Sequence, residues 1–239
     1  MLLTAEKKYT DFQKGQVILV NKPLDWTSFD IVNKIRSTLK PITGKIKVGH
    51  AGTLDPKADG LLIICTGKST KTIDAYQNLD KIYEGEIFLG ASTPSYDSET
   101  EADFKFEMAH IELDEIKEAC ASFSGFIKQV PPVFSAIKVK GEASYLAARK
   151  GLKPKLKERT VEIKEFSVLS YQYPLVKFRV HCSKGTYIRS LAHDLGQHLK
   201  GGAYLKYLKR TAIGEYKLSD AWEIDDLTAY IKEYALKNV

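Results

Sequence analysis

The sequence predicts a protein of the mixed α/β class, because stretches with the patterns of buried strands are interleaved with stretches that have the 3.6-residue period of helices. A chain of 239 residues can bury one substantial core, or a core with a small lobe. The strand-like stretches are residues 17–20, 61–65, 83–90, 161–168 and 175–182. The helix-like stretches are residues 30–39, 113–123, 188–199 and the segment that leads to residue 239.

Turn and capping residues mark the ends of these elements. Thr27 and Ser28 supply the N-cap of the first helix, and Pro41 is expected to close it. Gly125 follows the second apolar stripe, and the pair at 201–202 is glycine, so both positions predict helix ends.

Composition places the chain among ordinary globular proteins, with 44% hydrophobic and 28% charged residues. No apolar run reaches the length of a membrane span, and the first residues lack the apolar region of a signal peptide. The three cysteines are far apart in sequence, which favours buried thiols in a reducing compartment. We therefore expect a cytoplasmic protein without contact with a membrane.

The net charge of +6 and the pI near 9.0 indicate a polyanionic partner. Residues 131–159 carry eight Lys or Arg and two Glu, so the rest of the chain has 28 basic and 28 acidic residues. Such a segment is either a solvated face or a phosphate-binding surface.

The stretch 48–72 carries the strongest chemical pattern. Gly49, Gly52 and Gly60 predict a shaped loop, and Pro56 restricts the backbone of Asp55. The buried strand at 61–65 follows at once, so the loop can hold the Asp55 carboxylate on a rigid base. Taken alone, the Asp-Pro pair is also compatible with an ordinary turn.

Two other interpretations of this stretch fail. Gly67, Lys68 and Ser69 resemble the end of a phosphate-binding P-loop, but Leu62 stands where that motif requires glycine. His50 lacks a second histidine or cysteine at ligand spacing, so we expect no metal site.

Four motifs resemble the TruB family of pseudouridine synthases, and the resemblance covers roughly residues 16–215. The first is Gly-His-Ala-Gly-Thr-Leu-Asp-Pro at 49–56, and the second is Lys-Pro followed by Thr-Ser at 22–28, where Asp25 replaces the usual glycine. The third begins at Gln129 with Pro-Pro and has Phe134 where tyrosine is usual. The fourth is Ser-Lys-Gly-Thr-Tyr-Ile-Arg at 183–189.

The resemblance implies a pseudouridine synthase fold, a largely antiparallel mixed sheet flanked by helices, as one catalytic domain over 1–239. Residues 131–159 would form an inserted RNA-binding thumb. The expected activity is isomerisation of uridine to pseudouridine at position 55 of the transfer RNA T-loop, without a cofactor. We expect a monomer that needs no protein partner and a short family form without the C-terminal RNA-binding (PUA) domain.

The resemblance also assigns roles to single residues. Asp55 is the expected catalytic carboxylate, Arg189 its ionic partner, and Tyr83 the residue that stacks on the flipped base. The expected RNA or substrate contacts are His50, Lys71, Tyr187, Leu208, Lys22, Asp97, Lys138 and Arg149.

Several of these residues also have a purely structural interpretation. Tyr83 opens a strand and could be a packing residue, and Asp97 lies in a polar loop and could be solvated. Arg189 falls off the apolar stripe of its helix, so it is not expected to be simply part of the core. The basic and aromatic residues of 203–211 are either RNA-facing or surface residues.

The residues leave the chemical intermediate open: Asp55 could attack uracil C6, attack ribose C1′ or remove a 2′ proton. Two alternative functions also remain, a non-catalytic RNA-binding or RNA-folding protein on the same scaffold and a synthase that acts on another RNA.

Overall fold

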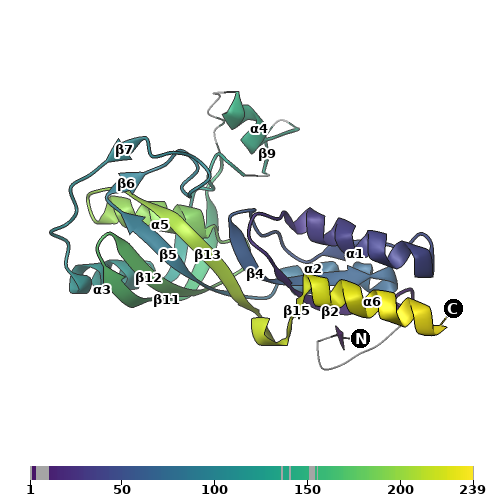
Figure 1. Ribbon diagram of the computed structural model, residues 1–239. Coiled ribbons are helices and arrows are strands. Elements are labelled where there is room, and N and C mark those ends of the chain that lie inside the picture. Colours follow the sequence, from purple (N-terminus) through teal and green to yellow (C-terminus); the bar gives the residue numbers. More distant parts are fainter. Residues whose placement is uncertain are drawn as a thin grey trace. The chain divides into compact units, whose positions relative to one another are not determined.

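The computed structural model describes residues 2–3, 11–135, 137–139, 141–150, 154 and 156–238. The chain divides into two compact units (Figure 1). The first unit contains residues up to Ile82 together with those from Lys209 onwards, and the second unit contains Tyr83–Leu208.

The first unit is built on a sheet in which β2 (Val17–Lys22) pairs antiparallel with β4 (Ala58–Thr66), from Val17 opposite Cys65 to Lys22 opposite Gly60. The end of β13 (Ala203–Ile213) lies on the other side of β4. Short strands extend this sheet: β1 (Leu2–Leu3) and β15 (Trp222–Glu223) run parallel to β2, whereas β3 (Val48–His50) and β14 (Tyr216–Lys217) pair antiparallel with β4 and β13.

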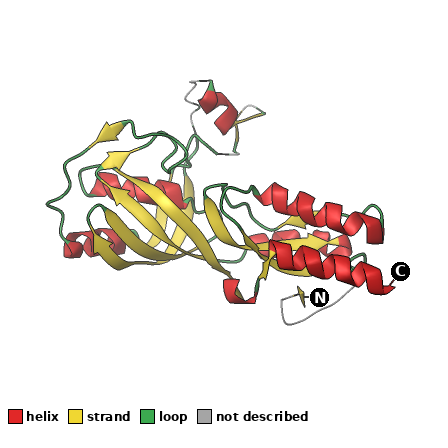
Figure 2. Cartoon of the chain, in the orientation of Figure 1, coloured by secondary structure: helices red, strands yellow, loops and turns green. Residues whose placement is uncertain are grey.

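Helices cover both faces of this sheet (Figure 2). On one face, α1 (Ser28–Thr43) and α6 (Ile224–Asn238) pack Ile35 and Leu227 against Ile18 and Leu62. On the other face, the short helices η1 (Gly67–Thr72) and α2 (Ile73–Gln77) place Ile73 beside a second buried cluster. A 3₁₀ turn, η2 (Leu218–Asp220), leads to β15.

The predicted N-cap of α1 is confirmed, but the predicted helix end is wrong. The Thr27 hydroxyl accepts a hydrogen bond from the Asp30 N–H at 3.0 Å, and the Asp30 carboxylate accepts one from the Thr27 N–H at 2.8 Å. Pro41 lies inside the helix, which continues to Thr43. Proline removes one backbone donor, and the next turn still closes because the Gly44 N–H donates to the Lys40 carbonyl at 3.0 Å.

The second unit is built on strands in the order β13, β5 (Lys81–Leu89), β12 (Leu175–Cys182), β11 (Arg159–Gln172) and β8 (Gly125–Gln129). The β11 strand pairs antiparallel with both β12 and β8, as expected for a largely antiparallel mixed sheet. Two helices, α3 (Leu113–Ser122) and α5 (Ile188–His198), and the small hairpin of β6 (Ala91–Ser92) with β7 (Phe104–Lys105) complete this unit.

The strand predicted at 83–90 is confirmed as β5, and its burial alternates from residue to residue. Tyr83, Gly85, Ile87 and Leu89 are buried, and the residues between them are partly exposed. A Cβ atom at Gly85 would lie 2.3 Å from the Tyr207 carbonyl oxygen, so β13 can approach β5 closely only beside glycine.

Residues 131–159 contain a small hairpin of β9 (Lys138–Val139) and β10 (Glu142–Ala143), followed by α4 (Ser144–Arg149). The Ser144 hydroxyl donates to the Val133 carbonyl at 2.5 Å, which ties the start of α4 to the chain before the hairpin. Lys140, Lys153 and Lys155 lie outside the described residues. Among the helices that are described, none is long and apolar enough to cross a membrane.

Candidate active site

Asp55 lies in the loop that connects β3 to β4 in the first unit. The loop leaves the sheet at Ala51, whose N–H donates to the Ile63 carbonyl at 2.8 Å. Gly52 has φ of +101°, a conformation that side chains with a Cβ rarely adopt, so this glycine is needed for the turn. Asp55 itself is half-buried, and Pro56 and Lys57 beside it are exposed.

The first helix and the turn before it hold the Asp55 loop from one side. The Ser28 hydroxyl accepts a hydrogen bond from the Leu54 N–H at 2.8 Å and donates one to the Leu54 carbonyl at 3.1 Å. The Asp25 N–H donates to the Pro56 carbonyl at 2.8 Å. The residues immediately before and after Asp55 are therefore fixed by separate hydrogen bonds.

Arg210, on β13, holds the same loop. The expectation that the basic residues of 203–211 are RNA-facing or surface residues is wrong for Arg210, which is buried. Only 1% of Arg210 is exposed. Its guanidinium donates to the carbonyls of Leu61 at 2.8 Å, Gly52 at 3.1 Å and Thr53 at 3.4 Å. A Cβ atom at Gly60 would lie 2.4 Å from the Arg210 carbonyl oxygen, so glycine is required for this contact.

Lys22 is fully buried. Its ammonium group donates to the Trp26 carbonyl at 2.6 Å and to the Pro23 carbonyl at 2.9 Å. Burial lowers the pKa of Lys22 to about 8, and the nearby carboxylates of Asp59 and Asp55 oppose this shift. The side chain therefore closes the turn before α1 and places a cation within the field of Asp55.

The other two expected contacts of this unit differ in exposure. His50 is partly buried, and burial together with the Arg210 cation lowers its pKa below the usual value of 6.5, so its imidazole is neutral at pH 7. Lys71 lies in η1 with an exposed side chain.

Asp25 adopts φ of +64°, which explains why glycine is usual at this position of the motif. Aspartate is one of the few residues with a Cβ that enter the left-handed region readily. Its carboxylate lies 2.7 Å from the Lys57 ammonium group, and both side chains are exposed. The turn therefore keeps its shape despite the substitution.

In the second unit, Arg189 and Asp97 form a buried ion pair. Arg189 Nη1 lies 3.3 Å from Asp97 Oδ2, and the two side chains are 5% and 7% exposed. The same nitrogen donates to the Phe134 carbonyl at 2.9 Å and to the Ser95 carbonyl at 3.4 Å. Arg189 thus lies off the apolar stripe, as expected, but is nevertheless buried.

Asp97 is also held by its own loop, so the alternative that it is solvated is wrong. The Ser95 hydroxyl donates to Asp97 Oδ1 at 2.6 Å, and the Glu99 N–H donates to the same atom at 2.9 Å. Tyr96 between them has φ of +64° and stacks on His193 of α5, with ring centroids 3.9 Å apart. Since Arg189 and His193 are four residues apart on α5, one helix face fixes the whole loop.

Tyr187 is fixed by a glutamine to which the sequence motifs assigned no role. The Gln129 amide accepts from the Tyr187 N–H at 2.8 Å and donates to the Tyr187 carbonyl at 3.0 Å. The Arg159 guanidinium lies 4.4 Å from the centre of the Tyr187 ring, a cation–π contact. Tyr83 and Leu208 are each 8% exposed, which agrees with packing on their strands.

The structure thus brings the predicted residues together in two groups. The first group, in the first unit, consists of Asp55 in its loop with Lys22 and His50. The second group, in the second unit, consists of Arg189 with Asp97 and Tyr187. The pairing of Arg189 with Asp55 would join residues of different units and stays a prediction. The side chains of Lys138 and Arg149 lie outside the described part of the structure.

Arg210, Gln129 and Ser28 are the structural supports that sequence reasoning missed. Only Arg210 carried a usable signal, because strand alternation from the buried Leu208 places it on the same face. In the described part of the chain, no three His, Cys, Asp or Glu side chains are grouped so that they could hold a metal ion.

Comparison with known proteins identifies the chain as a pseudouridine synthase. A family model described as "TruB family pseudouridylate synthase (N terminal domain)" matches residues 40–188. A second, described as "tRNA pseudouridylate synthase B C-terminal domain", matches residues 189–239. The chain therefore belongs to the TruB family.

Relatives named tRNA pseudouridine synthase B align over most of their length. The protein of Parabacteroides distasonis is 47% identical over 95% of this chain and 97% of its own. That of Flavobacterium johnsoniae is 48% identical over 90% and 95%, and that of Chlorobaculum tepidum 49% identical over 89% of both.

Chains in solved structures share the fold of this chain. A Cbf5-Nop10-Gar1 complex contains a chain with a TM-score of 0.72 and 28% identity, and an H/ACA RNP bound to a substrate RNA containing 2′-deoxyuridine contains one with a TM-score of 0.70 and 27% identity. Each match covers 95% of this chain but only 57% and 56% of the matched chains.

Proposed function

We propose that this chain isomerises uridine to pseudouridine at position 55 of the transfer RNA T-loop, with Asp55 as the catalytic carboxylate. The observation that carries the proposal is a half-buried carboxylate in a loop whose adjacent residues, Leu54 and Pro56, are each held by a hydrogen bond, and whose Gly52 carbonyl is held by Arg210. The relatives named tRNA pseudouridine synthase B supply the substrate class.

The reaction needs no net oxidation or hydrolysis. The bond from ribose C1′ to uracil N1 breaks, a bond from C1′ to C5 forms, the C5 proton leaves and N1 gains a proton. A fixed anion that acts as nucleophile or base meets this requirement, and no cofactor is needed to balance the step.

The surroundings of Asp55 favour such a role. The contacts of Arg210 and Ser28 limit movement of the loop, so little free energy is lost in positioning the carboxylate when substrate binds. The buried ammonium of Lys22 adds a positive field that favours the ionised form of Asp55. Lys22 acts in this proposal as a positioning residue.

The remaining roles follow from the family resemblance. Tyr83 stacks on the uracil after it leaves the RNA helix, a contact worth ~1–3 kcal/mol for an aromatic side chain and a base. Arg189 orients and ionises Asp55 through a charge-assisted contact. His50, Lys71 and Tyr187 contact the RNA, and Leu208 packs beside the base.

The test uses T-arm RNA that is tritiated at uracil C5, because isomerisation releases that tritium. We expect release by the wild-type protein at the T-loop uridine and a rate for Asp55→Asn below about a thousandth of it, with RNA binding retained. Asp59→Asn is the matched control. Like Asp55, Asp59 is a carboxylate that interacts electrostatically with Lys22, and its side chain lies 3.4 Å from the Lys209 ammonium group.

The outcomes separate the alternatives. Tight binding of T-arm RNA without release would indicate an RNA-binding protein on this scaffold. Release only from ribosomal or messenger RNA stem-loops would indicate another substrate. Turnover by Asp55→Asn near the wild-type rate would remove Asp55 from its role.

We propose in addition that the protein is a monomer, acts without a protein partner and resides in the cytoplasm. Three buried cysteines without a disulfide, Cys65, Cys120 and Cys182, suit a reducing compartment. Light scattering behind a sizing column tests the monomer: a mass near twice 26.8 kDa would contradict it.

A further inference from the structure

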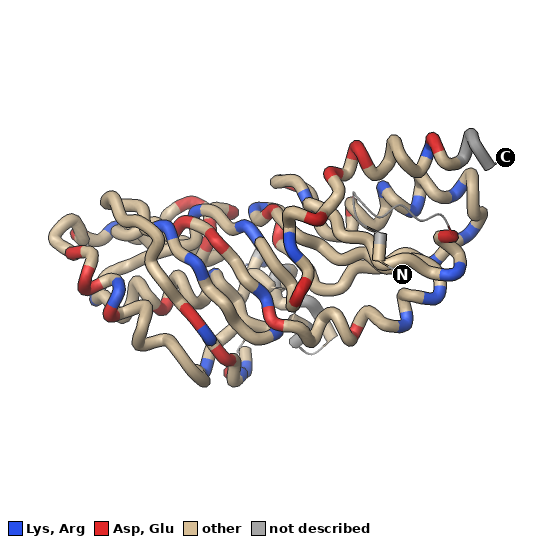
Figure 3. Tube along the Cα trace, turned by 90° about the horizontal axis from the view of Figure 1, so that it is seen from below, with Lys and Arg blue, Asp and Glu red and all other residues tan. Residues whose placement is uncertain are grey.

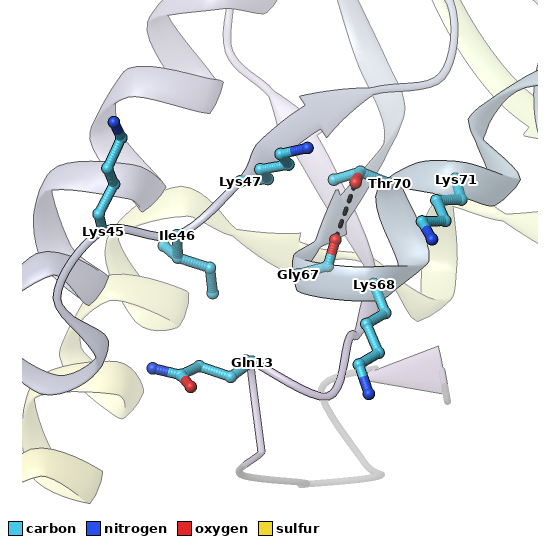
Figure 4. A pocket seen from close by; sticks show the side chains of 8 residues that line it. All are labelled: Gln13, Lys45, Ile46, Lys47, Gly67, Lys68, Thr70 and Lys71. Carbon is cyan, nitrogen blue, oxygen red and sulfur yellow. Dashed lines mark hydrogen bonds between the residues drawn. The ribbon is translucent and has the colours of Figure 1, made fainter.

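A basic hollow lies in the first unit and is lined by Lys45, Lys47 and Lys68, to which no role was assigned above, together with Lys71 (Figure 4). Its volume is about 310 Å³. A second hollow of about 520 Å³ shares Lys45 and Lys47 with it and adds Arg36. We use the name basic groove for the two hollows together. Its cations come from three segments of the chain.

The charge of the basic groove is not neutralised by its lining. No carboxylate lines either hollow. The four lysine side chains are exposed, and no described residue offers any of them a carboxylate within ion-pair distance. Asp11, the acidic residue close to Gln13 in sequence, is paired with Lys14 at 3.1 Å. Such a concentration of cations around a hollow favours a polyanion.

Hydrogen bonds hold together the segments that line the basic groove. The Gly67 N–H donates to the Lys47 carbonyl at 2.9 Å, and the Thr70 hydroxyl donates to the Gly67 carbonyl at 2.8 Å (Figure 4). A Cβ atom at Gly67 would lie 2.3 Å from the Gln13 carbonyl oxygen. Three chain segments thus meet here, and the lysines project from a fixed base.

Between the cations the surface is apolar. Ile46 lines both hollows and is 8% exposed, and Ile73 and Val48 line the second. A cationic rim over an apolar floor suits a ribose-phosphate chain, in which charged phosphates alternate with less polar sugars.

The sequence also shows an excess of positive charge in the region of the basic groove. Residues 34–71 carry eight Lys or Arg and two Asp, the same balance as residues 131–159. The remaining chain then has 20 basic and 26 acidic residues. The excess of positive charge is therefore divided between two segments, and the first unit holds one of them. Figure 3 shows Lys and Arg gathered along the part of this unit drawn at the right.

In the sequence, only β3 separates the basic groove from the Asp55 loop. Lys47 is followed by β3, which ends at His50, and the loop that carries Asp55 begins at the next residue. A nucleic acid strand that follows β3 from the groove would reach the loop within the same unit.

We propose that the basic groove binds the sugar-phosphate backbone of the RNA strand next to the target nucleotide, without reading its bases. The identity of the polyanion as RNA rests on the proposed function. The groove's lysines extend the surface of Lys71, which was already an expected RNA contact, and they position the strand independently of the segment 131–159.

The test compares two triple variants with equal loss of charge. Lys45→Gln, Lys47→Gln and Lys68→Gln remove three cations of the groove, and Lys105→Gln, Lys217→Gln and Lys232→Gln remove three exposed cations elsewhere. Binding of T-arm RNA is measured by fluorescence anisotropy from about 50 to 300 mM salt. We expect the groove variant to bind roughly 10- to 100-fold more weakly near 150 mM salt, with a salt slope lower by about 2 to 3.

The controls separate this proposal from the proposed function. RNA binding is measured without turnover. An inactive wild-type protein would therefore contradict the proposed function, whereas the binding comparison of the two triple variants would still decide the proposal for the groove. Equal affinity and equal salt slopes for the two triple variants would overturn the proposal that the basic groove binds RNA. So would a site for inorganic tripolyphosphate that depends on these lysines while the RNA slope is unchanged. Unaltered circular dichroism and melting temperature show that the variants are folded.

Discussion

Arg189 and Asp97 make a charged contact that water hardly reaches, with side chains 5% and 7% exposed. Removing one partner of such a pair leaves the other charge buried, which typically costs about 3–5 kcal/mol. We therefore expect Arg189→Met to lower the free energy of unfolding by about that amount, as measured by urea denaturation. The double variant with Asp97→Asn should lose less than the sum of the single variants. Strict additivity would contradict the pairing.

Asp25 tests how much the left-handed turn costs. A residue with a Cβ loses about 1–2 kcal/mol in this region, whereas glycine does not. The exposed pair with Lys57 contributes about 0–1 kcal/mol. We expect Asp25→Gly to melt higher than Asp25→Ala, with a free-energy difference of about 1–2 kcal/mol between the two variants. Since both lack the ion pair, equal stability would show that the turn carries no strain.

At the scale of the element, α5 carries a carboxylate that destabilises the fold at neutral pH. Burial raises the pKa of Asp194 from 3.8 to about 6. Because the folded protein then holds its proton more tightly than the unfolded chain, stability falls as pH rises from about 4 to 6 and stays lowered above that. We expect Asp194→Asn to unfold at higher urea than wild type at pH 7.5 and at the same urea near pH 3.5. A constant difference at both pH values would contradict this origin.

Patterned elements were predicted well, and their long-range supports were not. The periods of apolar residues located β2, β5, β12, α3 and α5 to within a few residues, because burial on one face is a local property of the sequence. The carbonyl groups held by Arg210 lie in residues about 150 positions away in the chain. No local pattern encodes such partners.

The candidate site shows the same division. The motif at 49–56 identified Asp55, and spacing along α5 placed Arg189 off the apolar stripe. The contact of Arg189 with the Phe134 carbonyl depends on how a distant segment returns to the helix, and nothing in the motif encodes it. The fully buried state of Lys22 was equally hidden, because lysine is rarely buried without partners and those partners are backbone carbonyls.

At the scale of the whole molecule, the segment 131–159 is the second basic region that we expect to bind RNA phosphates. Neutralising Lys153, Lys155 and Lys157 should weaken RNA binding and lower the salt slope by about 0.7 to 0.9 for each phosphate that the protein no longer neutralises. Anisotropy titrations at several salt concentrations measure both effects. An unchanged slope would return this segment to the role of a solvated face.

The boundary between the two units passes through the interior of β5, at Ile82 and Tyr83, and of β13, at Leu208 and Lys209. A gene fragment that encodes the second unit alone would lack the first two residues of β5 and the second part of β13, so strand backbone groups would lose their neighbours. Loops offer no place to cut the chain between the units. Neither unit should therefore be obtainable as a separate recombinant product, and heating should melt the protein in a single cooperative step.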